Sequence, residues 1–150
     1  MERALTSAPP ASREFRVLVI DDSEVDRELT TRHLGKAWPF EHGMAVAYAA
    51  TGPEALDRMR RQRFALIVLD WKLPGLGGGE LLQQLRHNGV RVPVVVLSGL
   101  KREAITEDLQ ALAAAFLNKD DLNPLTFHRA IAESLQLLGL TQPAPSSSAA

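Results

Sequence analysis

The chain contains no cysteine, which excludes disulfide bonds, thiolate nucleophiles and zinc sites built on thiolate ligands. It has no apolar run close to the roughly 20 residues that a membrane-spanning helix needs. Residues 1–13 carry charges and two prolines where a signal peptide would be apolar. Positive charge is not in excess, because 17 Lys and Arg stand against 18 Asp and Glu. We therefore expect a cytoplasmic protein that has neither nucleic acid nor a membrane as a partner.

The length and the apolar content suffice for one folded domain, since the chain has 150 residues and 45% of them are hydrophobic. Both ends are small, polar and rich in proline, with the stretches TSAPPAS and TQPAPSSSAA. Such segments bury too little apolar surface to offset the entropy of ordering. We expect disordered tails over residues 1–13 and 140–150 and one domain over residues 14–139.

Between the tails, apolar runs alternate with helical patterns, which is typical of βαβ units around a parallel sheet. The expected strands are Arg16–Ile20, Met44–Ala49, Phe64–Leu69, Val92–Leu97 and Ala114–Asn118. The expected helices are Glu24–Lys36, Glu54–Arg61, Gly79–Arg86, Arg102–Ala113 and Leu125–Leu138. The sequence therefore predicts an α/β fold, a doubly wound parallel sheet of five strands with helices on both faces, whose ligands bind at the carboxyl ends of the strands.

Polar side chains stand at the ends of four of the expected strands. Asp21 and Asp22 follow the first strand, Asp70 the third, Ser98 the fourth and Lys119 the fifth. Each has an ordinary explanation alone, as a helix cap, a loop residue or a solvated charge. Because the carboxyl ends of parallel strands meet at one edge of a sheet, the whole set favours a functional site.

The charges of this set indicate a metal ion. Three carboxylates face one ammonium, and each close pair of like charges costs about 1–4 kcal/mol at surface-like dielectric constants. A divalent cation would offset that repulsion. Ligands that are all oxygen favour a hard ion, so we expect Mg²⁺, with Mn²⁺ as an alternative.

Four stretches of the chain resemble the receiver domain of two-component response regulators. They are VLVIDDSE, LIVLDWKLPGLGG, VVVLSG and FLNKD, and the resemblance extends over roughly residues 16–139. It implies a flavodoxin-like fold with strand order 2-1-3-4-5 and five helices in three layers. Carried over residue by residue, it implies that Asp70 is the phosphoacceptor. It also implies that Asp22 is a direct metal ligand, Asp21 a ligand acting largely through water, and Lys72 a ligand through its main-chain carbonyl.

The same resemblance assigns the remaining roles. Ser98 and Lys119 would contact the phosphoryl oxygens, and Phe116 would change rotamer with phosphorylation, reshaping the face made by the fourth helix, fifth strand and fifth helix. The Lys72 side chain is unusual and is expected to alter the lifetime of the phosphoryl group. After the lysine that Lys119 matches, the family usually has a proline, often with a cis peptide bond. This chain has Asp120 there, and we expect a trans bond because a cis bond without proline costs roughly 3–4 kcal/mol.

The expected function is that of a signalling module in a phosphorelay. A sensor histidine kinase or a histidine phosphotransfer protein would supply the phosphoryl group, and a downstream protein would bind the switched face. The module would catalyse only its own phosphorylation and slow dephosphorylation. The sequence does not decide whether the domain forms a homodimer.

A stand-alone receiver is expected because no output segment follows Gly139. The alternatives are a receiver of a hybrid kinase or larger regulator and, from another class, a phosphohydrolase with an aspartyl nucleophile. That hydrolase family carries Asp-x-Asp after its first strand, whereas this chain has Asp21-Asp22-Ser23.

Overall fold

The computed structural model describes residues 15–38, 43–99 and 105–137. The two predicted tails, over residues 1–13 and 140–150, lie outside these ranges. None of the helices within the described ranges is both long enough and apolar enough to cross a membrane.

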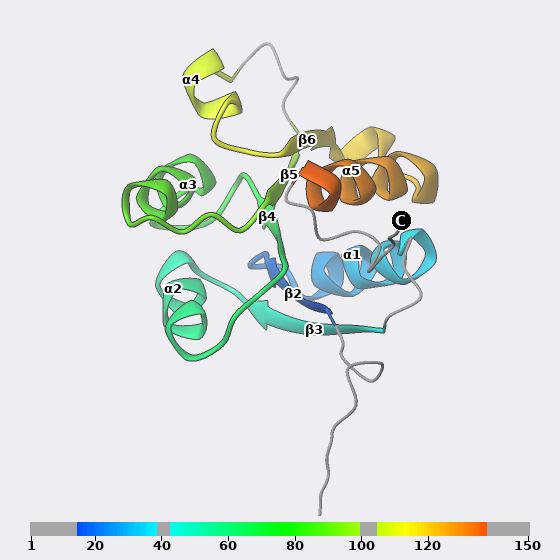
Figure 1. Cartoon of the computed structure of the whole chain (residues 1–150), viewed down its shortest axis with the longest axis horizontal. Coiled ribbons are helices and arrows are strands. Elements are labelled where there is room, and N and C mark those ends of the chain that lie inside the picture. The colour runs from blue at the N-terminus through cyan, green and yellow to red at the C-terminus, as the bar shows by residue number, and fades with distance from the viewer. Residues whose placement is uncertain (1–14, 39–42, 100–104, 138–150) are drawn as a thin grey trace, which may run out of the picture.

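The five strands of the described residues form one parallel sheet (Figure 1). They are β2 (Phe15–Ile20), β3 (Met44–Ala49), β4 (Leu66–Asp70), β5 (Val94–Ser98) and β6 (Ala115–Asn118). Their order in the sheet is β3-β2-β4-β5-β6. In chain order this is 2-1-3-4-5, so the predicted topology is confirmed.

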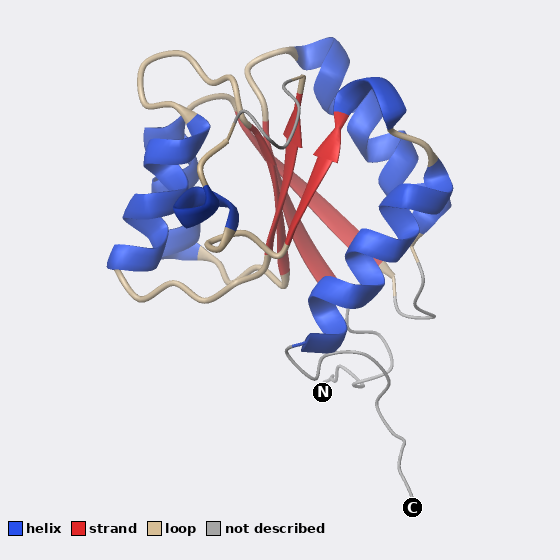
Figure 2. Cartoon of the chain, turned by 90° about the horizontal axis from the view of Figure 1, so that it is seen from above, coloured by secondary structure: helices blue, strands red, loops and turns tan. Residues whose placement is uncertain are grey.

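Helices cover both faces of the sheet, which makes three layers (Figure 2). The helices of the described residues are α1 (Glu24–Ala37), α2 (Gly52–Arg61), α3 (Gly78–His87), α4 (Glu107–Gln110) and α5 (Pro124–Leu137). Figure 1 shows α2, α3 and α4 on one face, and α1 and α5 on the other.

The sheet separates two hydrophobic cores, because successive side chains of a strand point to opposite faces. In β2, Leu18 and Ile20 belong to the core under α2 and α3, whereas Val17 and Val19 belong to the core under α1 and α5. The helices contribute fully buried side chains to these cores, namely Leu81, Leu82 and Leu85 from α3, Leu34 from α1, and Phe127, Ile131 and Leu135 from α5. Each such burial stabilises the fold by about 1.5–3 kcal/mol.

The start of α1 is fixed by a cap directly after the two adjacent acids. The Ser23 hydroxyl accepts a hydrogen bond of 3.2 Å from the backbone N–H of Asp26, which would otherwise lack a partner in the first turn. The helix therefore begins at Glu24, and its first turn stays beside the end of β2.

The fourth helix is shorter than predicted. We expected a helix over residues 102–113, but among the described residues it comprises only Glu107–Gln110. The backbone N–H of Ala114 already joins the sheet through a hydrogen bond of 2.9 Å to a carbonyl of β5. The Leu112 carbonyl accepts a bond of 2.9 Å from Arg86 Nε. Tertiary contacts thus override the helix propensity of this alanine-rich segment.

Candidate functional site

Three carboxylates gather at the carboxyl edge of the sheet, as the sequence predicts. Oxygen atoms of Asp21, Asp22 and Asp70 all lie within 4.8 Å of one another. Asp21 follows β2 and Asp70 ends β4, and these two strands are neighbours in the sheet. Asp21 is 2% exposed and Asp70 6%, whereas Asp22 faces solvent. Asp70 is the last residue of its strand and not the first loop residue, because it still pairs with Leu97 of β5.

Lys119 reaches this group from the end of β6. Its ammonium Nζ lies 3.2 Å from Asp70 Oδ1 and 3.8 Å from Asp21 Oδ2. A third carboxylate, that of Asp26 in the first turn of α1, lies 3.5 Å away. Burial by itself would lower the pKa of Lys119, but Asp70, Asp21 and Asp26 outweigh it and hold that pKa above its ordinary value. The lysine therefore stays charged at neutral pH.

Asp21 is the acid that the fold perturbs most clearly. Burial is the main cause that raises its pKa, from 3.8 to about 6, and the charges of Asp70 and Asp26 add to it. The backbone N–H of Ser23, which donates a hydrogen bond of 3.0 Å to Asp21 Oδ1, acts in the opposite direction, as does Lys119. Such crowding of buried negative charge is costly unless a cation shares it.

The donor set fits a hard divalent cation. All three side chains offer oxygen ligands, two of them are buried, and a single ammonium leaves two of the three negative charges unbalanced. The backbone N–H of Lys72 donates a hydrogen bond of 3.3 Å to Asp70 Oδ1, which draws the loop after β4 around the acid. The role of the Lys72 carbonyl as a ligand stays a prediction.

Ser98 ends β5 at the same edge of the sheet. It is 3% exposed, and its backbone pairs with Asn118 of β6. Since β5 lies between β4 and β6, Ser98 stands between the strands that carry Asp70 and Lys119. The sequence predicted this convergence correctly, although Ser98, like Asp70, belongs to its strand and does not follow it.

Phe116 lies two residues before Asn118 in β6 and is half-buried against the core under α2 and α3. Its ring contacts the indole of Trp71, with centroids 5.6 Å apart and an interplanar angle of 59°. Trp71 directly follows Asp70 in the chain. The pattern of the sequence did not indicate this contact, which joins the predicted acceptor to the predicted switch residue through one side chain.

The peptide bond between Lys119 and Asp120 is trans, as expected, since the described residues contain no cis bond. The segment Lys119–Asp121 forms a 3-10 turn. Asn118 Oδ1 accepts a hydrogen bond of 2.8 Å from the backbone N–H of Asp120. A proline could not donate this bond, so the side chain of Asn118 fixes the turn that proline would otherwise constrain.

A sequence model of the response regulator receiver domain matches residues 17–131, more than half of the chain. The chain belongs to the response regulator receiver domain family. The two-component signalling class that the resemblance implied is therefore confirmed. The receiver match includes every residue to which the sequence assigned a role, from Asp21 to Lys119.

Relatives and solved structures agree with this assignment. The receiver is 35% identical over 131 residues to the response regulator MprA of Mycobacterium avium, covering 86% of this chain and 53% of that protein. It is 34% identical over 110 residues to a protein-glutamate methylesterase/protein-glutamine glutaminase of Treponema denticola, covering 71% of this chain and 28% of that protein. The chain thus spans about half or less of these curated relatives.

The fold is similar to that of the chemotaxis protein CheY4 of Vibrio cholerae, with a TM-score of 0.69 and 26% identity over 82% of this chain and 100% of that one. It is also similar to the receiver domain of the Francisella response regulator 1452, with a TM-score of 0.66 and 28% identity over 83% of this chain and 99% of that one. The flavodoxin-like fold is confirmed.

Proposed function

We propose that this receiver accepts one phosphoryl group on Asp70. The observation that carries the proposal is the position of Asp70: it is a buried carboxylate 3.2 Å from the Lys119 ammonium and within a group of three acids. A cation beside the acceptor offsets the repulsion between a carboxylate nucleophile and the negative charge of an incoming phosphoryl group.

Asp21, Asp22 and Asp70, with the Lys72 carbonyl, would hold Mg²⁺, with Mn²⁺ as the alternative. When bound there, the ion would neutralise charge that develops on the phosphoryl oxygens. Asp21 and Asp22 are suited to this role because they are adjacent in the chain and follow a central strand, so the sheet holds one member of the pair rigidly.

The phosphoryl donor is a phosphohistidine, for which a small donor such as acetyl phosphate can substitute. One carboxylate oxygen of Asp70 attacks phosphorus, the O–P bond forms, and the N–P bond to the donor imidazole breaks. The imidazole nitrogen keeps the electron pair of that bond, and the ring leaves as neutral imidazole when its other nitrogen carries a proton. Lys119 and Ser98 would donate hydrogen bonds to the phosphoryl oxygens, which carry the negative charge throughout.

The phosphoryl group leaves by hydrolysis. A water oxygen attacks phosphorus, the bond to Asp70 breaks, and the products are inorganic phosphate and the free carboxylate. One phosphoryl group is thus consumed for each cycle, and the protein acts as a signalling switch and not as an enzyme with an external substrate. The methylesterase name of one relative does not extend to this chain, which covers 28% of that protein.

The partners follow from this chemistry. A sensor histidine kinase or a histidine phosphotransfer protein would supply the phosphoryl group, and the α4–β6–α5 face would bind a downstream protein. A homodimer through that face is the alternative. Phosphotransfer profiling against the histidine kinases of the source organism would identify the donor, since the cognate pair reacts fastest.

Incubation with acetyl phosphate tests the proposal. We expect one phosphate per chain when Mg²⁺ is present and none when a chelator replaces it. Small phosphomonoesters test the competing phosphohydrolase, because that enzyme would release many equivalents of phosphate from them. Multiple turnover of phosphomonoesters, or a chain that takes up no phosphate with Mg²⁺, would overturn the proposal.

A further inference from the structure

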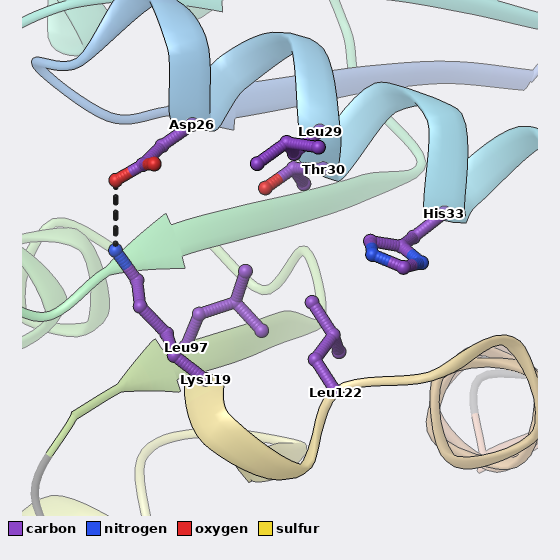
Figure 3. Close-up of a pocket in the computed structure, with 7 residues that line it drawn as sticks. All are labelled: Asp26, Leu29, Thr30, His33, Leu97, Lys119 and Leu122. Carbon is purple, nitrogen blue, oxygen red and sulfur yellow. Dashed lines mark ion pairs between the residues drawn. The ribbon is translucent and has the colours of Figure 1, made fainter.

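Asp26 is a fourth acid at the site, and it lies outside the group that would hold a cation. Its Oδ2 is 3.5 Å from Lys119 Nζ, and Figure 3 shows this ion pair bridging α1 and the end of β6. The group of three acids that could ligate a metal contains Asp21, Asp22 and Asp70 but not Asp26. Asp26 therefore acts on the site through the lysine.

Three carboxylates compete for one ammonium in this arrangement. Lys119 Nζ lies 3.2 Å from Asp70 and 3.8 Å from Asp21 at the strand ends, and 3.5 Å from Asp26 on α1. A cation bound by Asp70 and its neighbours would share the negative charge on that side and leave the charge of Asp26 undiminished. The attraction of Lys119 toward α1 would then increase relative to its attraction toward Asp70.

The pocket around the Lys119–Asp26 ion pair limits the positions that the ammonium can take. Figure 3 shows the side chains of Leu97 and Leu122 on the Lys119 side of the pocket, and Leu29 beside Asp26 along α1. The other polar side chains that line this pocket, Thr30 and His33, also belong to α1. The polar partners of the Lys119 ammonium in this pocket therefore lie either on α1 or at the strand ends.

We propose that Asp26 is a positioning residue that holds Lys119 back from the phosphoryl oxygens and so weakens the phosphorylated state. This inference rests on the proposed function. Phosphorylation must draw the ammonium away from Asp26, and the ion pair opposes that movement. The sign is specific: removing the Asp26 charge should strengthen binding of a phosphoryl group at Asp70, whereas an ordinary supporting residue would weaken it when removed.

Beryllofluoride, which stands in for a phosphoryl group on an aspartate, measures this directly in the presence of Mg²⁺. Its affinity is read from the NMR signal of the Trp71 indole. We expect Asp26→Asn to bind beryllofluoride about two- to fivefold more tightly than the unchanged protein, the range that partly exposed ion pairs support. Asp26→Glu keeps the charge and should restore the original affinity.

Glu24→Gln is the matched control, because Glu24 is an exposed acid in the same first turn of α1. It removes the same charge and the same favourable contact with the helix dipole, and its affinity should stay unchanged. A gain of equal size in Glu24→Gln would show a general charge effect and overturn the positioning role.

A double variant tests whether the effect of Asp26 requires Lys119. In a Lys119→Met background, Asp26→Asn should give no gain, because the ammonium that Asp26 restrains is absent. An equal gain in that background, or unchanged or weaker binding in Asp26→Asn alone, would overturn the inference while leaving the phosphoacceptor assignment intact. If the unchanged protein shows no response to beryllofluoride with Mg²⁺, both the proposed function and this inference fail.

Discussion

The indole ring of Trp71 contacts the phenyl ring of Phe116, with centroids 5.6 Å apart. Trp71 follows the predicted acceptor Asp70, and Phe116 stands two residues before Asn118 at the end of β6. Gly79 in the first turn of α3 lies against the indole as well, since a Cβ there would be 3.0 Å from the ring. A change at Asp70 therefore has a packed route to Phe116.

Ser98→Ala should separate phosphorylation from switching. A phosphoryl group on Asp70 offers the Ser98 hydroxyl a charge-assisted hydrogen bond, and the inward movement of Ser98 leaves space for a buried rotamer of Phe116. Losing such a bond removes about 1.5–3 kcal/mol of the free energy that favours the switched conformation. The ratio of switched to unswitched protein then falls roughly tenfold or more. We expect normal phosphate uptake but much smaller beryllofluoride-induced NMR shifts at Phe116 and residues 105–113.

Ser98→Thr is the control for that experiment, because it keeps a hydroxyl and should keep most of the shift. Shifts of the original size in Ser98→Ala would show that the signal reaches Phe116 by another route, such as the contact with Trp71.

The stability of the metal-free protein should depend on the charge of Asp21. Its pKa is about 6 in the fold against 3.8 as the ordinary value, so the fold favours the protonated acid. The resulting stabilisation is present in full below about pH 4 and is lost as the pH rises through 6, by on the order of 3 kcal/mol.

Urea unfolding in chelator at pH 4.5 and at pH 7.5 measures this effect against Asp21→Asn, whose side chain stays neutral. The variant should become more stable relative to the unchanged protein at the higher pH. The same difference in unfolding free energy at both values would contradict the assignment of the perturbed pKa to Asp21.

Two glycine substitutions should change stability in opposite directions. A Cβ on Gly78 would lie 2.8 Å from the Trp71 backbone and 2.9 Å from the Asp70 carbonyl oxygen, so Gly78→Ala should destabilise the fold by about 1–3 kcal/mol. A Cβ on Gly35, within α1, meets no atom within 4 Å, so Gly35→Ala should stabilise it by about 0.5–1 kcal/mol. Chemical denaturation checks both, and a Gly78→Ala protein as stable as the unchanged one would refute the close approach of α3 to the loop.

Much of the site was predictable because parallel strands bring their ends to one edge. The positions of Asp21, Asp70, Ser98 and Lys119 at the ends of four predicted strands therefore imply their proximity. The extent of α4 was not predictable, since Arg86 and the sheet compete with helix formation over an alanine-rich segment that favours a helix by itself.

The sequence did not indicate the roles of Asp26 and Trp71, for a different reason. Their roles depend on how α1 and the loop after β4 are rotated toward β6, and a single sequence carries no signal for that rotation. The nearest available signal for Asp26 was its place in the first turn of α1, which brings its side chain to the same end of the sheet as Asp21.

The most direct test of the account is the mass of the intact protein after incubation with acetyl phosphate and Mg²⁺, measured for the unchanged chain, Asp70→Ala and the control Asp57→Ala. Asp57 lies on α2 in an exposed ion pair with Arg61, so its loss removes a carboxylate outside the site. We predict one added phosphate on the unchanged chain and on Asp57→Ala, and none on Asp70→Ala. Labelling of Asp70→Ala to the level of the unchanged chain would contradict the account.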